Sequence, residues 1–481
     1  MSNQKNNRKT KIVCTIGPAT SSPEMIRRLI EAGMDVARLN FSHGTHDSHD
    51  KAIRDLRRVS REVGREIGIL MDLAGPKIRL GHIPAHERTL EPGTEVILVS
   101  GQSSTGDELP VNYPGLYEDV AVGDRILIAD GQVELCVLDK KNQLIYCEVV
   151  VGGVVTSNKG VNLPTSNLRT PTFTEKDRRD LKFGLSRDVD IVAMSFVRHE
   201  KDLDPLREIL NKMKRPSLLV AKIEKPEALE NLHGILGVVD GMMVARGDLG
   251  VEMPLAEVPL IQKRVIKEAR QAGKAVITAT QMLGSMLSSP RPSRAEVTDV
   301  ANAILDGTDA VMLSDETAMG RYPVEAVKVL DRICKATEPQ LASERFLDEE
   351  LSALLPATAA ALSRAVSWLA RDLKPAAIVA ATTSGSTARI IARYRPPQPV
   401  VGLTPEIRTC RQLCLSWGVL PALIPESENA DEVFNLVRKW AEETGLAGAG
   451  DRLIVTAGVP FKVPGTTNLI KIIEMGGPSQ H

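Results

Sequence analysis

Short β-branched apolar runs alternate with amphipathic stretches from Thr10 to about Ala336, and most of the runs end in glycine or a polar residue. This alternation is typical of βα units that build a parallel sheet. Eight runs follow one another, which is the number of strands that closes a (β/α)8 barrel. The predicted barrel strands are Lys11–Ile16, Asp35–Phe41, Gly68–Leu73, Val189–Phe196, Leu218–Ile223, Gly241–Ala245, Ala275–Ala279 and Ala310–Leu313.

The third connection of this barrel is unusual, because no helical pattern follows the third strand. From Gly81 to about Leu168 the chain instead shows short alternating strands separated by Gly, Asp and Asn turns. This pattern indicates an inserted all-β domain. We therefore assign residues 1–76 and 172–337 to the barrel and residues 77–171 to the inserted domain. The predicted strands of that domain are Glu95–Val99, Arg125–Ile128, Glu134–Leu138 and Leu144–Val151.

The carboxyl-terminal part of the chain has its own pattern. Residues 338–350 are polar and acidic, which suits a linker, and Leu354–Leu373 has helical periodicity. Strands then alternate with helices, as in a smaller open α/β domain that we assign to residues 351–481. Its predicted strands are Ala377–Ala381, Val400–Leu403 and Leu453–Val455.

Composition and charge mainly exclude certain classes of function. The 60 Lys and Arg residues balance 61 Asp and Glu residues, so no global positive field would hold a nucleic acid or a membrane surface. The 6 cysteines are scattered, and we expect them to be reduced. Residues 1–11 are polar and basic, and no segment offers about 18 uninterrupted apolar residues. We therefore expect a cytoplasmic protein.

Barrel enzymes build their sites at the carboxyl ends of the strands, so polar residues at those ends are the candidates for chemistry. In the second strand, alternation with a period of two places Arg38, Asn40 and Ser42 on one face. A guanidinium, an amide and a hydroxyl would then line one wall. A solvated edge strand explains this alternation about as well.

The fifth and sixth strands end in carboxylates. Alternation places Lys222 and Glu224 on one face, and two glycines around Asp248 permit a tight turn whose N–H groups can meet an anion. Glu224 and Asp248 supply hard oxygen ligands that suit Mg2+ or Mn2+. The alternative is a pair of structural ion pairs, Glu224 with Lys222 and Asp248 with Arg246.

The sequence argues against a zinc site, a Ser-His-Asp triad and a P-loop. Three histidines recur every three residues at 43, 46 and 49, but no i, i+4 pair suits a zinc site. Neither a nucleophile elbow nor a Walker A loop is present. Two arginines and a lysine around paired carboxylates instead suit phosphoryl groups, whose charge must be neutralised. The other polar residues of this predicted mouth are Asp72, Arg79, Thr280, Ser314 and Glu316.

At these residues the sequence resembles the pyruvate kinase family. The resemblance covers the whole barrel and, more weakly, the inserted and carboxyl-terminal domains. It implies transfer of the phosphoryl group of phosphoenolpyruvate to ADP, followed by protonation of enolpyruvate to pyruvate, which is the last step of glycolysis. The stretches that carry it, in family order, are KIVCTIGPAT, ARLNFSHG, DLAGPKIR, NKGVNLP, AKIEKPEAL, VARGDLGVE, TATQML and VMLSDETA.

The resemblance also implies how the substrate is held. Arg38 would bind the transferring phosphoryl group, Lys222 would stabilise its charge in the transition state, and Glu224 with Asp248 would hold Mg2+ or Mn2+. The substrate carboxylate would rest on the N–H groups around Gly247 and Asp248 and on the Thr280 hydroxyl. The side that delivers the proton would be bordered by Thr280, Ser314 and Glu316.

A relayed water is the proton donor that we favour over Lys222, because an ammonium close to phosphate keeps its proton. The resemblance further implies that Arg79 and Lys159 reach the nucleotide phosphates and that Asn40 and His43 lie near the nucleotide. The inserted domain, which carries Lys159, would close as a lid that excludes water.

Animal members of the family need a monovalent cation, and this chain departs from them at two positions. Their cation ligands match Asn40, Ser42, Asp72 and the Leu73 carbonyl, but Leu73 and Lys77 stand where they carry Thr and Glu. An ammonium at Lys77 would place a fixed positive charge in the same mouth. We therefore predict activity that does not require K+. The alternative is a solvated surface lysine.

An effector site is predicted in the carboxyl-terminal domain. Hydroxyls, a glycine and free N–H groups at a helix start can cradle a phosphate, although many strand-to-helix turns look similar. Family members bind a sugar phosphate or nucleotide here, with residues 464–467 forming a nearby loop. Because Thr383 replaces the family's lysine, fructose 1,6-bisphosphate, a sugar monophosphate and AMP all stay open. The matching residues are Thr382, Thr383, Ser384, Gly385, Ser386 and Thr387.

Two other functions remain as alternatives. A metal-dependent barrel aldolase or lyase that acts on a pyruvate enolate also uses a Glu and an Asp on a divalent ion, but it needs no nucleotide site. A non-catalytic sugar-phosphate sensor would not need Lys222, Glu224 and Asp248. Family members are usually homotetramers, and we expect the same assembly here.

Overall fold

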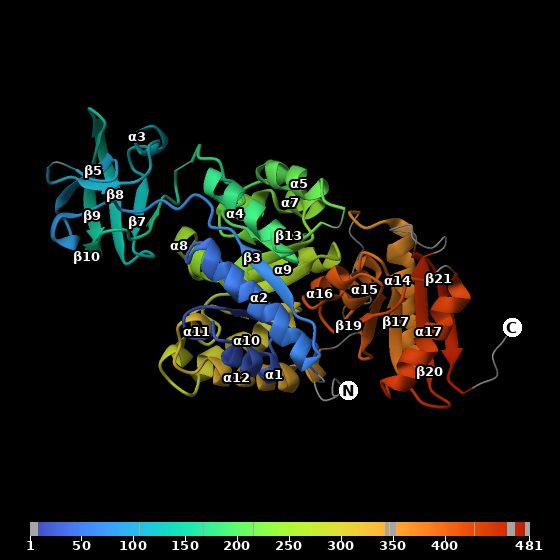
Figure 1. The fold of residues 1–481 in the computed structure, drawn as a ribbon. Helices are drawn as coiled ribbons and strands as arrows, with labels where there is room; N and C mark the ends of the chain where they lie inside the picture. The colour runs from blue at the N-terminus through green and yellow to red at the C-terminus, as the bar shows by residue number, and fades with distance from the viewer. Residues whose placement is uncertain are drawn as a thin grey trace.

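The computed structural model describes residues 8–104, 106–166, 168–214, 216–341, 346, 353–427, 429–458 and 467–476. Three parts follow one another across the molecule, with the barrel between a β domain and an α/β domain (Figure 1). The predicted fold class, a (β/α)8 barrel with an inserted all-β domain and a carboxyl-terminal open α/β domain, is confirmed.

Eight parallel strands close the barrel, and each end lies within two residues of its predicted position. Nearly all strand residues are buried, because helices cover the outer face and side chains fill the interior. This is why the strands could be recognised as short, nearly continuous apolar runs. In order around the barrel they are β1 (Lys11–Thr15), β2 (Val36–Asn40), β3 (Gly68–Asp72), β12 (Ile191–Met194), β13 (Leu218–Ile223), β14 (Gly241–Ala245), β15 (Ala275–Ala279) and β16 (Ala310–Leu313).

Helices and short 3-10 turns connect the barrel strands and pack their apolar residues on them. Hydroxyl caps begin several of them, such as Thr174 at the start of α4, whose oxygen accepts from the Asp177 N–H. These elements are α1 (Pro23–Ala32), α2 (His46–Val63), α4 (Glu175–Ser186), η3 (Glu200–Leu203), α5 (Asp204–Asn211), α6 (Pro226–Glu230), α7 (Leu232–Val238), α8 (Arg246–Glu252), α9 (Val258–Gln271), η4 (Gly284–Leu287), α10 (Arg294–Asp306), α11 (Asp315–Ala318), α12 (Pro323–Thr337) and η5 (Glu338–Gln340).

The inserted domain contains a six-stranded and a two-stranded sheet, and all four predicted strands are present. Four further strands were not predicted, because each has only two to four residues and too little alternation to be recognised. Its elements are η2 (Pro84–His86), β4 (Glu87–Leu90), β5 (Glu95–Ser100), β6 (Leu109–Val111), α3 (Leu116–Asp119), β7 (Arg125–Ile128), β8 (Val133–Lys141), β9 (Leu144–Val151), β10 (Gly153–Thr156) and β11 (Val161–Asn162).

The carboxyl-terminal domain is a five-stranded sheet in the order β19-β18-β17-β20-β21, in which only β21 is antiparallel to its neighbour. Strands β19 and β21 were not predicted. Most of the predicted linker at 338–350 and most of the loop at 464–467 lie outside the described residues. The elements are α14 (Ala357–Leu373), β17 (Ala377–Ala381), α15 (Ser386–Ala392), β18 (Val400–Thr404), α16 (Ile407–Leu413), β19 (Val419–Leu423), α17 (Ala430–Glu443), β20 (Arg452–Gly458) and β21 (Thr467–Glu474).

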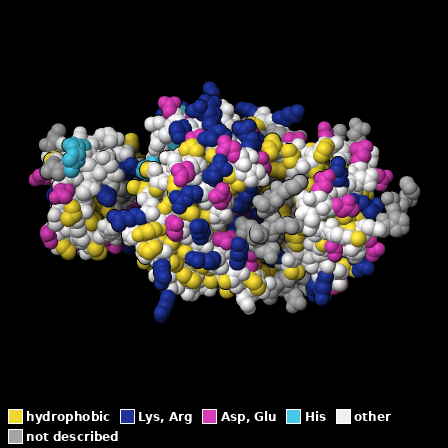
Figure 2. Space-filling model, turned by 60° about the horizontal axis from the view of Figure 1, so that its bottom comes forward, with side chains coloured by type: hydrophobic (Ala, Val, Ile, Leu, Met, Phe, Trp, Pro, Cys, Tyr) yellow, Lys and Arg dark blue, Asp and Glu magenta, His cyan; other side chains and the backbone are white. Residues whose placement is uncertain are grey.

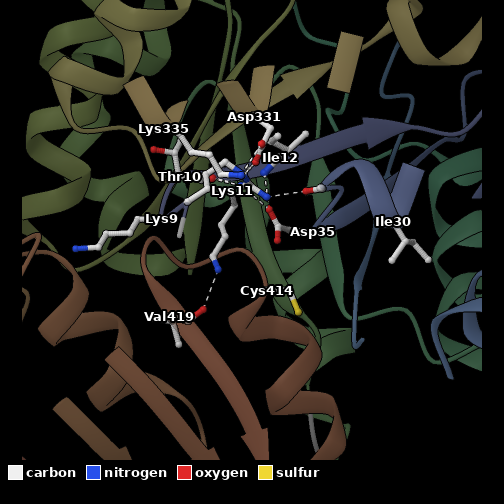
Figure 3. A network of polar contacts seen from close by, with 12 residues as sticks. Lys9, Thr10, Lys11, Ile12, Ile30, Asp35, Asp331, Lys335, Cys414 and Val419 are labelled. Atoms are coloured by element: carbon white, nitrogen blue, oxygen red, sulfur yellow. Dashed lines mark hydrogen bonds and ion pairs between the residues drawn. The ribbon is translucent and has the colours of Figure 1, made fainter. Parts of the chain in front are cut away.

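Buried charges join the carboxyl-terminal domain to the amino-terminal end of the barrel. Lys11 at the start of β1 donates from Nζ to the Val419 carbonyl at 2.8 Å (Figure 3). Beside it, the Arg8 guanidinium lies 2.8 Å from Asp35 and 3.0 Å from Asp331. Helix α16 lies between the barrel and the five-stranded sheet of the carboxyl-terminal domain (Figure 1). The opposite end of the barrel, where the strands end, is therefore left open toward the inserted domain.

The surface agrees with the balanced charge of the sequence. Figure 2 shows Lys and Arg side chains interspersed with Asp and Glu side chains over the face that it presents. Within the part of the chain that the structure describes, no helix is long and apolar enough to cross a membrane.

Candidate active site

Four charged side chains meet at the carboxyl ends of β2, β3 and β13. The Arg38 guanidinium lies 2.7 Å from the Asp72 carboxylate, and the Lys222 ammonium lies 3.4 Å from the other oxygen of Asp72. The same ammonium lies 2.8 Å from Glu224. Both carboxylates are only 1% exposed. Arg38 from the predicted wall on β2 and the predicted pair on β13 thus belong to one buried network, whereas Asn40 and Ser42 are half-buried and contact each other instead.

The charges in this network control one another's ionisation. Burial alone would raise the pKa of Asp72, but Lys222 and Arg38 outweigh it and lower the pKa of that carboxyl. Burial would likewise lower the pKa of Lys222, but Asp72 and Glu224 raise it above its ordinary value. Asp72 is therefore held as a carboxylate and Lys222 as an ammonium.

Asp248, in the first turn of α8, belongs to the same charged cluster. Burial raises the pKa of Glu224 above its ordinary value, and the nearby charge of Asp248 raises it further against the opposing charge of Lys222. Of the two alternative ion pairs, only that of Lys222 with Glu224 exists. Arg246 lies 2.7 Å from Asp299 instead of pairing with Asp248.

The paired carboxylates fit a divalent cation. Among the described residues, no group of three or more His, Cys, Asp and Glu side chains could hold a metal ion. A two-carboxylate site nevertheless suits Mg2+ or Mn2+, which keep several waters and prefer hard oxygen ligands. The charge of Asp248 contributes to the raised pKa of Glu224, after burial and against Lys222. A cation held between them would remove this repulsion.

Thr280 closes the mouth beside α8. Its hydroxyl accepts a 2.7 Å hydrogen bond from the Gly247 N–H, and its carbonyl accepts one from Arg246 at 2.7 Å. Its φ is 69°, a left-handed conformation that is uncommon for a β-branched residue and costly unless the surroundings enforce it. The two contacts supply that enforcement. The predicted carboxylate site at Gly247 and Thr280 thus consists of groups that already touch one another.

Ser314 and Glu316 lie on the neighbouring side, where β16 ends. One oxygen of the buried Glu316 carboxylate accepts from the Ser314 N–H at 2.8 Å, and the other accepts from the Leu283 N–H at 3.1 Å. Glu316 therefore ties the ends of β15 and β16 together.

A cleft of about 800 Å³ separates the barrel mouth from the inserted domain, with Ser42, Lys77 and Arg79 in its wall. Burial lowers the pKa of Lys77, as do the charges of Lys222 and Arg79, whereas Asp248 and Asp72 act in the opposite direction. Burial lowers the pKa of His43, and the nearby charges of Lys77 and Arg79 lower it further. These cations would attract an anionic ligand.

The residues predicted for a monovalent cation lie on adjacent strands. Asn40 and Asp72 are register partners of β2 and β3. The Asn40 side-chain oxygen accepts from the Ser42 N–H at 3.1 Å, which fixes the turn that follows β2. Leu73 continues β3 directly. Lys77 lies in the cleft wall with Ser42, and its side chain is exposed there.

Lys159 has no hydrogen bond or ion pair to this network among the described residues. It is exposed in the turn between β10 and β11, and its carbonyl accepts a 2.8 Å hydrogen bond from the Leu80 N–H. Its backbone therefore lies beside Arg79. This bond lies within the inserted domain and joins the turn that carries Lys159 to the segment that carries Arg79.

The predicted effector loop forms a turn closed by its own hydroxyls. The Thr382 hydroxyl accepts from the Gly385 N–H at 2.9 Å, and the Ser384 and Ser386 hydroxyls lie 3.2 Å apart. Gly385 has a φ of 79°, which favours glycine at the start of α15. Thr387 contacts Thr467 at 2.6 Å. The backbone carbonyl of Thr383 accepts a hydrogen bond from the Thr409 hydroxyl at 2.8 Å, which joins the loop to α16.

Two hydroxyl residues of the site were missed by the sequence reasoning. Ser195 follows β12 and contacts Lys222, with 2.8 Å between Oγ and Nζ. Thr15 ends β1 and accepts from Arg38 at 2.9 Å. The rule that selects polar residues at the carboxyl ends of barrel strands would have found both. These two were overlooked, although Ser42, Thr280 and Ser314 near other strand ends were selected.

Comparisons with known proteins agree along the whole chain. Residues 7–327 match the family described as pyruvate kinase, barrel domain, and residues 360–473 match pyruvate kinase, alpha/beta domain. Pyruvate kinases of two Staphylococcus aureus strains, USA300 and NCTC 8325, are 45% identical over 98% of this chain and 81% of their own length. A crystal structure of a pyruvate kinase from Cryptosporidium parvum aligns with a TM-score of 0.92 at 35% identity, covering 98% of this chain and 97% of that one.

Proposed function

Because the chain belongs to the pyruvate kinase family, and is therefore a phosphotransferase that converts phosphoenolpyruvate and ADP to pyruvate and ATP, we propose that the buried network of Arg38, Asp72, Lys222 and Glu224 is its active site. The observation that carries this proposal is the Lys222 ammonium, which two buried carboxylates keep charged. A charged group that is already desolvated needs no reorganisation when negative charge develops next to it.

The transferring phosphoryl group would lie against two cations of this network. Arg38 would bind its oxygens, since a planar guanidinium suits paired oxygen acceptors. Lys222 would stabilise the charge that develops during transfer. Asp72 contacts both cations and would hold them in place.

A divalent cation on Glu224 and Asp248 would neutralise phosphoryl oxygens and orient them for in-line transfer. Mg2+ and Mn2+ both suit these oxygen ligands. The substrate carboxylate would take the N–H groups at Gly247 and Asp248 and the Thr280 hydroxyl. It would replace the hydrogen bonds that the Gly247 N–H donates to this hydroxyl and that the hydroxyl donates to the Ala279 carbonyl. Thr280, Ser314 and Glu316 would border the side from which a relayed water protonates enolpyruvate.

The nucleotide would occupy the cleft, where Arg79 meets its phosphates and Asn40 and His43 lie nearby. Lys159 would join them as the inserted domain closes as a lid and excludes water. The excess of Lys and Arg over Glu118 and Asp119 in the wall of the cleft supports this assignment. It also distinguishes the protein from an aldolase or lyase, which has no nucleotide to bind, and the comparisons do not favour that alternative.

The organisation that we propose around this site follows from the same arrangement. The barrel comprises residues 1–76 and 172–337, the lid residues 77–171, the linker residues 338–350 and the effector-binding domain residues 351–481. We propose a cytoplasmic homotetramer.

An assay that couples pyruvate formation to NADH oxidation tests the activity. We expect the rate to require both ADP and phosphoenolpyruvate and to be lost in Lys222→Met.

We expect full activity without K+, because the Lys77 ammonium would supply the positive charge that a monovalent cation supplies elsewhere. Initial rates measured with tetramethylammonium in place of K+ test this. A fall of more than about tenfold in K+-free buffer would show that Lys77 does not replace the cation. Lys77→Met is the matched control, and we expect its rate to fall and to recover in part when K+ is added.

We propose that a phosphorylated metabolite bound at residues 382–387 activates the enzyme. Ser384→Asp or Ser386→Asp is expected to abolish activation and to spare basal turnover, because a carboxylate in the loop repels phosphate. The rate at subsaturating phosphoenolpyruvate, measured with and without fructose 1,6-bisphosphate, glucose 6-phosphate or AMP, separates the candidate effectors. Loss of activation together with basal turnover would contradict the assignment.

A further inference from the structure

Ser195 stands out because its buried hydroxyl lies directly between the Lys222 ammonium and the strand that leads to the inserted domain. We propose that Ser195 is a positioning residue, which aims the ammonium of Lys222 at the transferring phosphoryl group. This inference rests on the proposed role of Lys222. It adds to the site a residue that acts without touching the substrate.

The strand register brings the two residues together. Strands β12 and β13 are parallel neighbours in which Met194 pairs with Ala221, so the next residue of each strand is Ser195 and Lys222. Ser195 is 2% exposed, and its Oγ lies 2.8 Å from Lys222 Nζ. The backbone pairing of the two strands therefore brings about the contact between Ser195 and Lys222, and this contact is buried.

The direction of each hydrogen bond is determined by the chemistry of the donors. An ammonium has three N–H donors and no acceptor, so the Ser195 oxygen must accept from Lys222. The hydroxyl proton is then directed to the Leu73 carbonyl, 2.8 Å away. Ser195 thus has one orientation, in which it joins Lys222 to the end of β3.

Three groups of different charge surround the ammonium of Lys222, and Asp72 Oδ1 among them accepts no hydrogen bond from it. Asp72 and Glu224 are carboxylates at 3.4 and 2.8 Å, whereas Ser195 at 2.8 Å is neutral. A third carboxylate would cancel positive charge that the phosphoryl group needs. A neutral hydroxyl fixes the direction of the ammonium and leaves that charge available.

The turn that carries Ser195 is itself held firmly. The Phe196 N–H donates to Glu224 at 2.7 Å, so consecutive residues of one turn hold both members of the Lys222–Glu224 pair. Phe196 has a φ of 58°, an uncommon conformation for an aromatic residue that a rigid environment must maintain. Gly75 packs against its ring so closely that an added Cβ would lie 2.7 Å from Cδ2. Such a turn can position a side chain accurately.

Ser195→Ala tests the proposal. We expect kcat to fall about 10- to 100-fold, because a charged hydrogen bond is lost, while KM for phosphoenolpyruvate changes less than about threefold. Isothermal titration of phosphoenolpyruvate with Mg2+ present and ADP absent should give unchanged affinity. Ser195→Thr, which keeps the hydroxyl, should recover at least part of kcat.

Ser217→Ala is the matched control. Ser217 is also 2% exposed and also donates to a neighbouring backbone carbonyl, that of Val189 at 2.7 Å, but it lies at the opposite end of the barrel. We expect this variant to keep the kcat of the unmodified enzyme. A kcat for Ser195→Ala within about threefold of this control would overturn the proposal.

Two other results would also overturn it. One is a rise in KM that accounts for the whole loss of kcat/KM, since positioning acts on turnover. The other is a well-folded Ser195→Thr that is as slow as Ser195→Ala. Lys222→Met, measured in parallel, distinguishes failure of the proposed role of Lys222 from failure of the proposed role of Ser195. If it keeps full activity, the proposed role of Lys222 fails, whereas an inactive Lys222→Met with a normal Ser195→Ala rejects only the role of Ser195.

Discussion

Replacing Lys222 by methionine is expected to lower kcat by at least about 100-fold, because the variant loses the charge that meets the phosphoryl group in the transition state. Methionine has nearly the length of lysine, so the loss is mainly one of charge. Asp72 and Glu224 would then face each other without the ammonium that lies between them. We expect the divalent ion still to bind, since neither Glu224 nor Asp248 is changed.

Steady-state rates and Mn2+ titration of the same preparation measure both expectations. Lys11→Met is the matched control, because Lys11 is another buried lysine, 6% exposed, at the opposite end of the barrel. Its ammonium contacts only the Val419 carbonyl among the hydrogen bonds of the described residues. We expect the basal kcat of Lys11→Met to lie within about threefold of that of the unmodified enzyme. A Lys222→Met variant as active as this control would remove Lys222 from the mechanism.

Replacing Glu224 by glutamine is expected to raise the Mg2+ concentration for half-maximal activity by at least about 100-fold. Loss of a residue that merely supports a ligand typically costs 10- to 100-fold in metal affinity, so loss of a direct ligand costs at least as much. The amide is nearly isosteric and can still accept from the Phe196 N–H. The charge is lost, and only Asp248 would remain to bind the ion.

Rates measured across a Mg2+ series, together with calorimetry of Mn2+ alone, determine whether the loss lies in metal binding. Asp190→Asn provides the control, because this buried carboxylate is ion-paired with Arg57 at 2.7 Å at the other end of the barrel. We expect it to lower stability and leave the Mg2+ dependence unchanged. An unchanged Mg2+ requirement in Glu224→Gln would show that the ion binds elsewhere.

Local patterns were sufficient to predict the barrel, because each strand is an apolar run of four to six residues that is buried on both faces. The same reasoning failed for β6 and β11, which have three and two residues. Strand β19 was missed because its exposed and buried residues do not alternate regularly. Strands of this kind depend on pairing with neighbours for their stability, and a single segment does not reveal that pairing.

The candidate site was predictable where alternation and strand position are enough, as for Arg38, Lys222 and Glu224. Which charged side chains form ion pairs with one another was not predictable from the sequence. Arg246 was a plausible partner of Asp248, yet it pairs with Asp299, 53 positions along the chain. Ser195 was overlooked because its importance comes from a neighbouring strand. Which side chains meet across strands depends on register and closure, and these involve the whole barrel.

By itself the sequence determined the eight barrel strands, the insertion after the third and the charged residues at the strand ends, because periodicity and residue type are local properties. Only the tertiary structure decided that Lys222 is held between Asp72, Glu224 and Ser195, and that Asp248 is left without its neighbouring arginine. The physical reason is that hydrogen bonds and ion pairs act over a few ångströms, and only closure of the barrel brings these distant segments that close.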